Sequence, residues 1–417
     1  MEVLYPRCAG LDVHKDTVVA AVRLVEEGSV LREVETFATT TPGLIALSDW
    51  LERHACPTIA MEATGIYWRP VWQVLVAEGS GEERTLILAN AAHVKNVPGR
   101  KTDVADAVWL SDLLAHGLIR PSFVPDEGTR AMRDLLRTRK QLVREQASHV
   151  QRIQKTLEDA NLKLASVLTD IMGQSGRAVL AALAAGETDP DRLRALVAPR
   201  VKATPEAIRA ALTGRPGPHH RFLLGLHLGQ IDALAAAIAA IDAKVERDLG
   251  PFREAVALLV TIPGVAELTA EVVLSEIGLD MSRFPSAGHL VSWAGLCPRN
   301  DESAGKRRST RLKKGAPWLK TALVQAAWAA ARKKQGYFNA QFQRLRGRRG
   351  ARKAICAVAA SILTTIYHML NDGTVYTDLG PDHFHRNQPI TRAKALVRQI
   401  ERLGFACSLS PAVPVSI

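Results

Sequence analysis

The first 120 residues alternate between short apolar runs and amphipathic runs, and this order is the strongest constraint on the fold. Residues 8–13, 17–24 and 30–37 are rich in β-branched side chains and are separated by the turn-like "HKDT" and "EEGS". They predict an antiparallel meander. Helical and strand patterns then alternate, beginning and ending with a helix, over residues 41–54, 58–63, 65–79, 84–90 and 102–116. Strands mixed with crossover helices predict an α/β layer sandwich.

The middle of the chain has a different period. From residue 129 to 171, and again from 231 to 249, apolar residues recur at three-then-four spacing, which lets long helices pair along a narrow seam. The seam residues are Met132, Leu135, Leu142, Val150, Ile153, Leu157, Leu164, Leu168, Ile231, Leu234, Ile238, Ile241, Val245 and Leu249. They predict a coiled-coil arm, formed within one chain or with a second copy. The intervening segment contains five prolines and predicts a poorly specified, Pro-rich connector.

The last third is predicted to be helical. Its tight "IPGVA" turn between two apolar helices resembles a helix-hairpin-helix, whose turn amides can bind a phosphate, so Pro263 and Gly264 are candidate nucleic-acid contacts. Ala266 replaces the usual second glycine of such turns. The three predicted domains are 1–125, 126–250 and 251–417, in keeping with a chain too long for one ordinary core.

Cysteine usage and hydropathy bear on the compartment. The five cysteines form no CxxC pair and no cluster with histidines, so neither a zinc ribbon nor a disulfide framework is indicated, and a reducing cytoplasm is expected. An aspartate inside the first apolar run argues against a signal peptide. The longest apolar stretch, residues 355–370, is short and contains His368, so we expect a buried helix and no membrane partner.

Positive charge is concentrated in one segment. Residues 301–360 contain 16 Lys and Arg residues and two acids, a charge of +14, whereas the rest of the chain carries −2. So one-sided a segment indicates a polyanionic partner, although a solvated basic face would look similar. The expected phosphate-binding residues are Gly305, Lys306, Arg307, Arg308, Arg311, Lys313 and Lys314.

Four carboxylates are expected to converge in the first domain. Asp12 lies on the first strand, Glu62 ends the short strand "TIAMEA", and Asp103 and Asp106 lie three apart on the last helix. Sites in open α/β sheets form at the carboxyl ends of strands, and converging acids need a counter-charge. Oxygen-only coordination favours Mg²⁺ or Mn²⁺, and two such ions can support phosphoryl transfer. Each acid taken singly could instead start a turn, pair with a neighbour such as Arg69, or compensate a helix dipole.

Ser303 stands where two acids give way to the basic segment, in "DESAGKRRS". It is either a loop hydroxyl without chemistry or a nucleophile held where a phosphate arrives. No base for this serine is visible in the local sequence.

With these residues in view, the chain resembles the DEDD insertion-sequence transposases (insertion-sequence family one hundred and ten) over nearly its whole length. The resemblance rests on the ordered set "AGLDVHKDT", "AMEATGIYWRPVWQVL", "NVPGRKTDVADAVWLSDLL", "IPGVAELTAEVVLSEIG" and "WAGLCPRNDESAGKRRSTRLKKGAPWLKTALVQAA". Its four acids match Asp12, Glu62, Asp103 and Asp106, and its serine motif matches Ser303-Ala304-Gly305, with alanine where many members have glycine.

The resemblance implies a fold and a reaction. It implies an N-terminal domain similar to the RuvC Holliday-junction resolvase and RNase H, and a C-terminal domain bearing a nucleophilic serine. Family members excise and insert DNA by recombination, and the best-described ones are guided by a structured noncoding bridge RNA. They are thought to form multimers, so a dimer or tetramer is expected in which one subunit's acids meet another's serine. The expected location is the bacterial cytoplasm, at the nucleoid.

Two other functions remain compatible with the residues. A metal-dependent, structure-specific nuclease similar to a junction resolvase would use the same acids with water in place of serine. A non-catalytic architectural protein would use the arm, hairpin turn and basic helices to hold nucleic acid, but it leaves the four acids unexplained.

Overall fold

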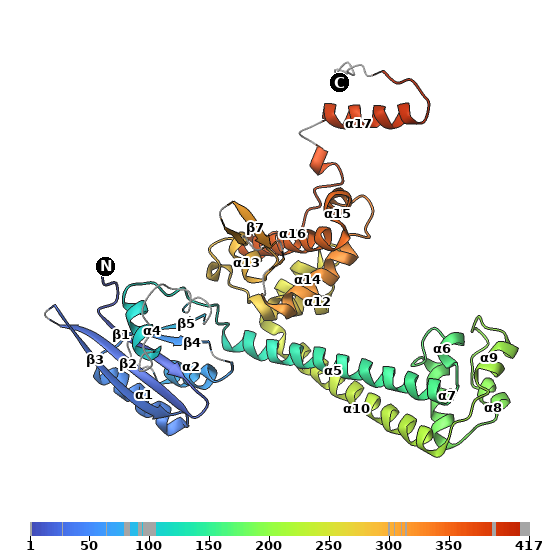
Figure 1. Cartoon of the computed structure of the whole chain (residues 1–417), viewed down its shortest axis with the longest axis horizontal. Coiled ribbons are helices and arrows are strands. Elements are labelled where there is room, and N and C mark those ends of the chain that lie inside the picture. Colours follow the sequence, from blue (N-terminus) through green and yellow to red (C-terminus); the bar gives the residue numbers. More distant parts are fainter. Residues whose placement is uncertain are drawn as a thin grey trace. The chain divides into compact units, whose positions relative to one another are not determined.

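The computed structural model describes residues 2–26, 28–63, 65–78, 84–90, 94, 106–298, 301–303, 305–309, 311–312, 315–385 and 389–408. The chain forms two compact units, Met1–Val124 and Pro125–Ile417 (Figure 1). The elements of the first unit are β1 (Arg7–Val13), β2 (Thr17–Glu26), β3 (Ser29–Ala38), α1 (Thr41–Arg53), β4 (Thr58–Glu62), α2 (Trp68–Ala77), β5 (Thr85–Ala89) and α4 (Asp106–Ala115).

A five-stranded mixed sheet forms the centre of the first unit, in the order β3-β2-β1-β4-β5. The first three strands are antiparallel neighbours, which confirms the predicted meander. β1 also pairs with β4, and β4 with β5, both in parallel. The central strand is therefore β1, and its carboxyl end lies beside that of β4.

Helices cover both faces of this sheet, as the α/β sandwich prediction requires. Alternate residues of β1 point to opposite faces. Ala9, Leu11 and Val13 belong to the core shared with α1 and α2, whereas Cys8 belongs to the core beneath α4. The helix α1 begins after Thr40, with Pro42 in its first turn, where a missing N–H costs nothing.

The second unit is almost entirely helical. Its elements are α5 (Glu127–Asp159), α6 (Leu164–Val167), α7 (Gln174–Ala185), α8 (Pro190–Ala195), α9 (Pro205–Ala211), α10 (Pro218–Asp248), α11 (Arg253–Val260), α12 (Glu267–Ile277), α13 (Ala287–Trp293), β6 (Asp301–Ser303), β7 (Lys306–Ser309), α14 (Pro317–Ala330), α15 (Tyr337–Arg349), α16 (Ala351–Asp372) and α17 (Pro389–Arg402), with short 3₁₀ turns at Gly250–Phe252, Met281–Arg283 and His383–His385.

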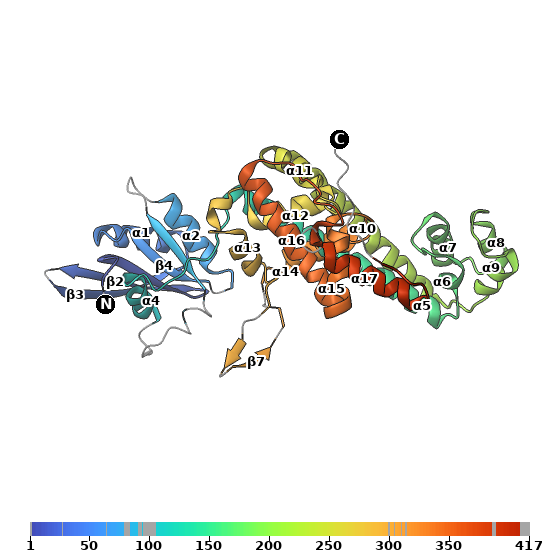
Figure 2. The same cartoon turned by 90° about the horizontal axis from the view of Figure 1, so that it is seen from above.

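The long helices α5 and α10 lie side by side within one chain (Figures 1 and 2). An ion pair joins Arg139 to Asp242, with Nε 2.5 Å from Oδ1, and the ring nitrogens of His149 and His227 are 3.2 Å apart. The predicted helical run from residue 129 to 171 ends earlier, at Asp159, where the chain turns into the segment that caps the arm. The arm therefore pairs internally along its length.

The Pro-rich connector is not poorly specified, contrary to the sequence-based expectation. It folds into α6–α9 around a shared core that includes Leu180, Leu183 and Leu193. Pro190, Pro205 and Pro218 each occupy the first turn of a helix, where proline's fixed φ favours initiation. These three prolines therefore start helices and do not interrupt them.

A buried charge network anchors the arm to the rest of the second unit. The Glu276 side chain is 2% exposed and accepts two hydrogen bonds from Arg137, at 2.7 and 2.8 Å. Arg133 donates to the backbone oxygens of Ser275 and Glu276. Because removal of one partner would leave a buried charge unpaired, this network fixes α5 against α12.

The C-terminal helices pack around α16, whose buried residues include Ile355, Ile362 and Ile366. The last third is helical, as predicted, but residues 323–345 form parts of two helices, because α14 ends at Ala330 and α15 begins after Gly336. Two helices, α10 and α16, are long and apolar enough by composition to cross a membrane. Here α10 packs on α5, and α16 packs on α13, α14 and α15.

Candidate functional site

Asp12 and Glu62 occupy adjacent positions at the carboxyl ends of two neighbouring parallel strands. The register of β1 and β4 pairs Gly10 with Ala60 and Leu11 with Met61, so Asp12 and Glu62 follow as the next pair. Leu11 and Met61 lie in the core under α1 and α2, whereas Ala60 lies in the core beneath α4. By alternation, both carboxylates are on the α4 face of the sheet.

The helix α4 brings a third carboxylate to the same edge. An alanine side chain at Gly10 would lie 2.2 Å from the backbone oxygen of Ala107 and 2.6 Å from the nitrogen of Ser111, so α4 crosses β1 in close contact. Cys8 donates from Sγ to the Ser111 oxygen at 3.5 Å, which shows that α4 runs antiparallel to β1. Its first residue, Asp106, therefore lies toward the Asp12 end of the strand.

Glycine at position 10 is thus required by the approach of α4. We expect Gly10→Ala to force α4 away from the sheet and to destabilise the first unit by about 3 kcal/mol, the cost of overpacking a tight contact. Urea unfolding followed by circular dichroism measures this. Gly229→Ala is the matched control, since nothing lies within 4 Å of an added side chain there, and it should not destabilise. Equal unfolding midpoints for Gly10→Ala and the unaltered protein would contradict this view of the α4 contact.

The surroundings of Asp12 differ from those of Asp112, the second aspartate on α4. The Asp12 side chain is 23% exposed, and its Oδ2 lies 3.3 Å from Nε2 of His14. Asp112 instead accepts from Arg23 at 3.0 Å and from Arg32 at 2.9 Å, so its charge is neutralised within the fold. Asp103, the remaining predicted ligand, lies outside the described residues.

Ser303 lies at the end of a β-hairpin. β6 and β7 pair in antiparallel register, with Ser303 opposite Lys306, so a two-residue turn connects them. Gly305 in this turn has a φ of +72°, a conformation that glycine adopts without strain. A second bridge, between Pro298 and Leu312, continues the ladder toward the helices. Figure 2 shows β7 extending beyond the neighbouring α13 and α14.

The predicted phosphate-binding residues are distributed along this hairpin and the loop after it. Lys306 and Arg311 are exposed. For Ser303, Arg307 and Arg308 the structure describes the backbone only, and Ala304, Lys313 and Lys314 lie outside the described residues. The hairpin therefore brings Ser303 and several cations onto one short projection.

Two models of transposase families match separate parts of the chain. A DEDD model of the IS110 type, described as a transposase, matches residues 9–162, which include all four predicted acids. A model described as the transposase IS116/IS110/IS902 family matches residues 256–343, which include Gly264 and the Ser303 hairpin. Together they cover more than half of the 417 residues. The chain belongs to the IS110 family of transposases.

A bacterial relative agrees with this assignment. The insertion element IS110 uncharacterized 43.6 kDa protein of Streptomyces coelicolor is 30% identical over 161 residues, which are 36% of this chain. The match spans 39% of the length of that relative.

In this IS110-family chain, the Pro263–Gly264 turn has a packing role of its own. It joins α11 to α12, and Gly264 has a φ of +86°. An added side chain at Gly264 would lie 2.4 Å from the Ala326 oxygen of α14. The glycine is therefore needed for helix packing, whether or not the turn also contacts nucleic acid.

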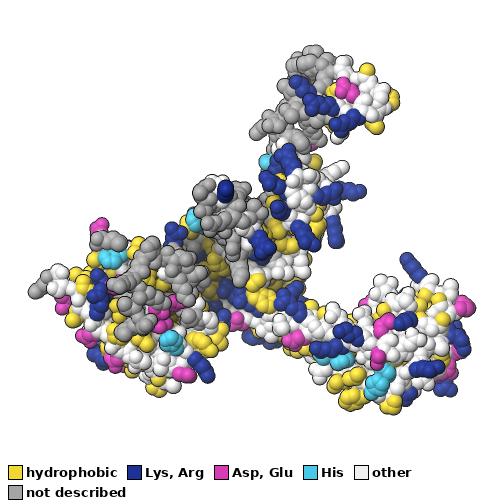
Figure 3. Space-filling view, viewed as in Figure 1, with side chains coloured by type: hydrophobic (Ala, Val, Ile, Leu, Met, Phe, Trp, Pro, Cys, Tyr) yellow, Lys and Arg dark blue, Asp and Glu magenta, His cyan; other side chains and the backbone are white. Residues whose placement is uncertain are grey.

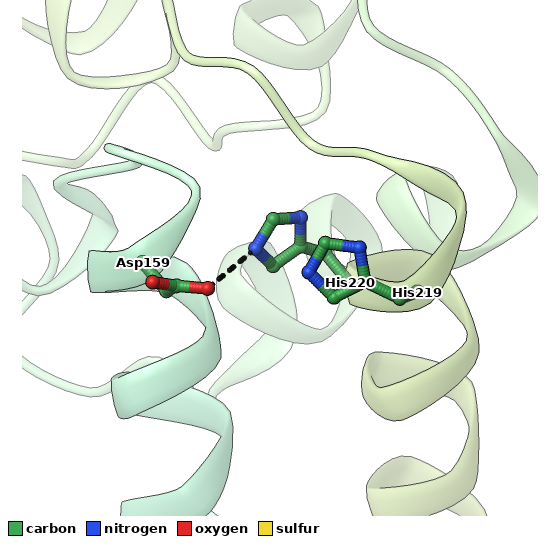
Figure 4. A group of neighbouring side chains, drawn as sticks. All are labelled: Asp159, His219 and His220. Atoms are coloured by element: carbon green, nitrogen blue, oxygen red, sulfur yellow. Dashed lines mark hydrogen bonds and ion pairs between the residues drawn. The ribbon is translucent and has the colours of Figure 1, made fainter.

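Asp159, His219 and His220 form a cluster that sequence reasoning missed, at the junction of α5 and α10 (Figure 4). The backbone N–H of Gly217 donates to Nδ1 of His220 at 3.0 Å, so Nε2 carries the proton and donates to Asp159 Oδ2 at 2.8 Å. Both ring nitrogens of His220 are therefore occupied. A metal ion would have to displace these hydrogen bonds, so the cluster acts as a cap for α10.

The sequence pattern also did not predict the hairpin that carries Ser303, or the part of the basic surface that α15 and α16 contribute. The Ala-Gly turn between Ser303 and Lys306 was the available signal for a hairpin. Arg349, Arg352 and Lys353 line a cavity together with Arg311, although some 40 residues of sequence separate them from it. Their composition was visible in the basic segment, but their convergence depends on the tertiary fold. Figure 3 shows Lys and Arg side chains gathered over the α15 region.

Proposed function

We propose that this chain is a DNA transposase that cleaves and rejoins strands during transposition of an insertion sequence. The observation that carries the proposal is the convergence of Asp12, Glu62 and Asp106 at one edge of the sheet, on the face covered by α4. Three carboxylates from three elements at the carboxyl ends of parallel strands are typical of a catalytic site. The IS110-family assignment supplies the reaction class.

The donor set fits a hard divalent cation. Its described members are all carboxylates, and Asp12 is largely withdrawn from solvent. Oxygen-only donors suit Mg²⁺ or Mn²⁺, so Asp12, Glu62 and Asp106, with Asp103, would hold such an ion. When bound, the ion supplies Lewis-acid polarisation of a phosphoryl oxygen. RuvC-like or RNase H-like architecture is part of this proposal, and the mixed sheet with parallel β1, β4 and β5 supports it.

Ser303 is the proposed nucleophile. Its Oγ attacks the phosphorus of a DNA phosphodiester, the Oγ–P bond forms, and the P–O3′ bond breaks. The proton lost by Ser303 is balanced by the one gained by the departing 3′ oxygen. The resulting phosphoserine ester preserves the bond energy, so a new 3′ hydroxyl can reverse the step and join a different strand. The location at the turn end of a hairpin supports this role, because a hairpin turn can approach a DNA strand closely.

The basic hairpin and the loop after it would hold the flanking DNA. Lys306 and Arg311 are exposed, and Arg307, Arg308, Lys313 and Lys314 are close to them in sequence. Phosphate contacts of this kind make binding weaken steeply as salt rises. Pro263 and Gly264 would contribute turn amides to the same purpose.

A noncoding guide RNA, a homo-oligomer and a location at the bacterial nucleoid complete the proposal. They come from the family resemblance, which the family-model matches strengthen. Both the acids and Ser303 must act on the same phosphodiester, and a dimer or tetramer can supply them from different subunits.

Mixing two inactive variants tests this sharing of subunits. We expect Asp106→Ala and Ser303→Ala each to be inactive alone and to recover strand exchange when combined, because one subunit then supplies the acids and the other the serine. The assay measures joined donor–target DNA by gel electrophoresis. Two differently tagged variants should first be shown to purify in one complex. If such a mixed complex remains as inactive as either variant, the subunits do not share acids and serine in this way.

A further inference from the structure

The base of the Ser303 hairpin forms one wall of a cationic cavity. The cavity has a volume of about 500 Å³ and is lined by apolar groups, including Leu296 and Leu312, and by four cations, Arg311, Arg349, Arg352 and Lys353. Among its lining residues, all of which the structure describes, there is no acid. None of the four cationic side chains has a hydrogen-bond or ion-pair partner among the described residues.

Two of these cations occupy an electrostatically unfavourable place. Arg352 and Lys353 lie in the first turn of α16, where the helix dipole is positive, no acidic residue is present and no side chain caps the backbone amides. Arg349, by contrast, lies in the last turn of α15, where a cation is favourable. Folding alone therefore gives no reason for positive charge at positions 352 and 353, whereas a bound anion would.

The remaining polar group of the cavity does not offset this charge. Burial raises the pKa of the Cys356 thiol, although Lys320 opposes the shift, so the thiol stays neutral at physiological pH. Unpaired cations around a partly apolar hollow suit a phosphodiester, whose charge pairs with the guanidinium groups and whose sugar contacts Leu296 or Leu312.

We propose that this cavity, formed by Arg311, Arg349, Arg352 and Lys353, binds a backbone phosphate of the DNA strand that Ser303 attacks. The proposal rests on the proposed function and adds residues of α15 and α16 that position the strand. Pro298 and Leu312, which pair across the base of the hairpin, both line the cavity, and Ser303 lies five residues after Pro298. Five residues span at most about 17 Å when fully extended, so the cavity lies within that distance of Ser303. This corresponds to about five nucleotides at 3.4 Å each, so the cavity holds a flanking phosphate.

Neutralising the two unfavourably placed cations tests the proposal. Arg352→Gln with Lys353→Gln should weaken binding of a fluorescein-labelled duplex by about tenfold or more in low salt, as measured by anisotropy. It should also reduce the slope of log K against log salt by about 1, for the loss of one phosphate contact. Covalent adduct should form more slowly at limiting DNA and recover at saturating DNA, because the cavity positions the strand and does not touch the reacting atoms.

The matched control is Lys333→Gln with Lys334→Gln. These two exposed lysines lie between α14 and α15 and do not line the cavity, so replacing them removes the same amount of positive charge elsewhere on the surface. The thermal midpoint of the cavity variant should be unchanged or higher, since a repulsion with the helix dipole is removed. DNA affinity and salt slope equal to those of the control would overturn the proposal. Weakened binding of an RNA of the same sequence, with unchanged DNA binding, would also overturn it.

This experiment distinguishes failure of the cavity assignment from failure of the proposed serine chemistry. If the unaltered protein forms no serine adduct but the cavity variant still loses DNA binding, the cavity is supported and the serine chemistry fails. If adduct forms equally in both and DNA binding is unchanged, the serine chemistry is supported and the cavity assignment fails.

Discussion

Replacing Ser303 by alanine is expected to abolish both the covalent protein–DNA adduct and strand exchange. The substitution removes the oxygen that forms the bond to phosphorus, so the rate should fall by at least about 10⁴-fold, as for the loss of other enzyme nucleophiles. DNA binding should persist, because Lys306 and Arg311 are untouched. The measurement is denaturing gel electrophoresis of end-labelled DNA incubated with protein and Mg²⁺.

Ser309→Ala is the matched control on the same hairpin. The Ser309 hydroxyl accepts a hydrogen bond from the Arg311 backbone N–H at 3.2 Å, so its loss should cost about 1 kcal/mol of local stability without removing any reacting atom. Adduct formation should continue. Adducts that persist in Ser303→Ala would remove this serine from the mechanism, and free 5′-phosphate ends without any adduct would favour a nuclease that uses water.

Loss of a carboxylate at the sheet edge is expected to have the second-largest effect. Asp12→Asn or Asp106→Asn removes one metal-binding charge, and the lost transition-state stabilisation of about 4 kcal/mol corresponds to about a 1000-fold slower cleavage. DNA affinity should stay the same or rise, because a negative charge is removed near a polyanion. Cleavage rates and anisotropy measured on the same preparations separate these two effects.

Asp49→Asn supplies the comparison, since Asp49 is an exposed aspartate on α1, which covers the opposite face of the sheet. Its cleavage rate should match that of the unaltered protein. Full cleavage by Asp12→Asn and Asp106→Asn would mean that these acids are structural. Binding without cleavage by the unaltered protein, on any donor and target and without dependence on metal, would favour an architectural role.

The sequence predicted the first unit well because its signals are local. Runs rich in β-branched residues marked β1, β2 and β3, and the position of each acid relative to a strand end was enough to expect Asp12 near Glu62. The role of Gly10 was not predictable. Glycine is needed at this position because α4, which lies about 100 residues later in the chain, packs against its backbone.

Prediction failed where several weak signals had to be combined in three dimensions. The five prolines of the connector predict a poorly specified segment, yet Asp189 and Thr204 cap the helices that two of these prolines begin. The hairpin that carries Ser303 has only three and four residues in its strands, too few for a periodic pattern to be recognised. The cavity at its base depends on the turn between α15 and α16, whose direction no local pattern specifies.

Mass spectrometry of the trapped adduct shows which residue forms the bond to DNA. The protein is incubated with DNA and Mg²⁺, denatured, and digested with a protease and a nuclease, and the peptide that retains a nucleotide is then sequenced. We expect a nucleotide mass on Ser303, absent when Asp106 is replaced by Asn. A nucleotide on any other residue, or strand exchange with no modified peptide, would contradict the serine mechanism.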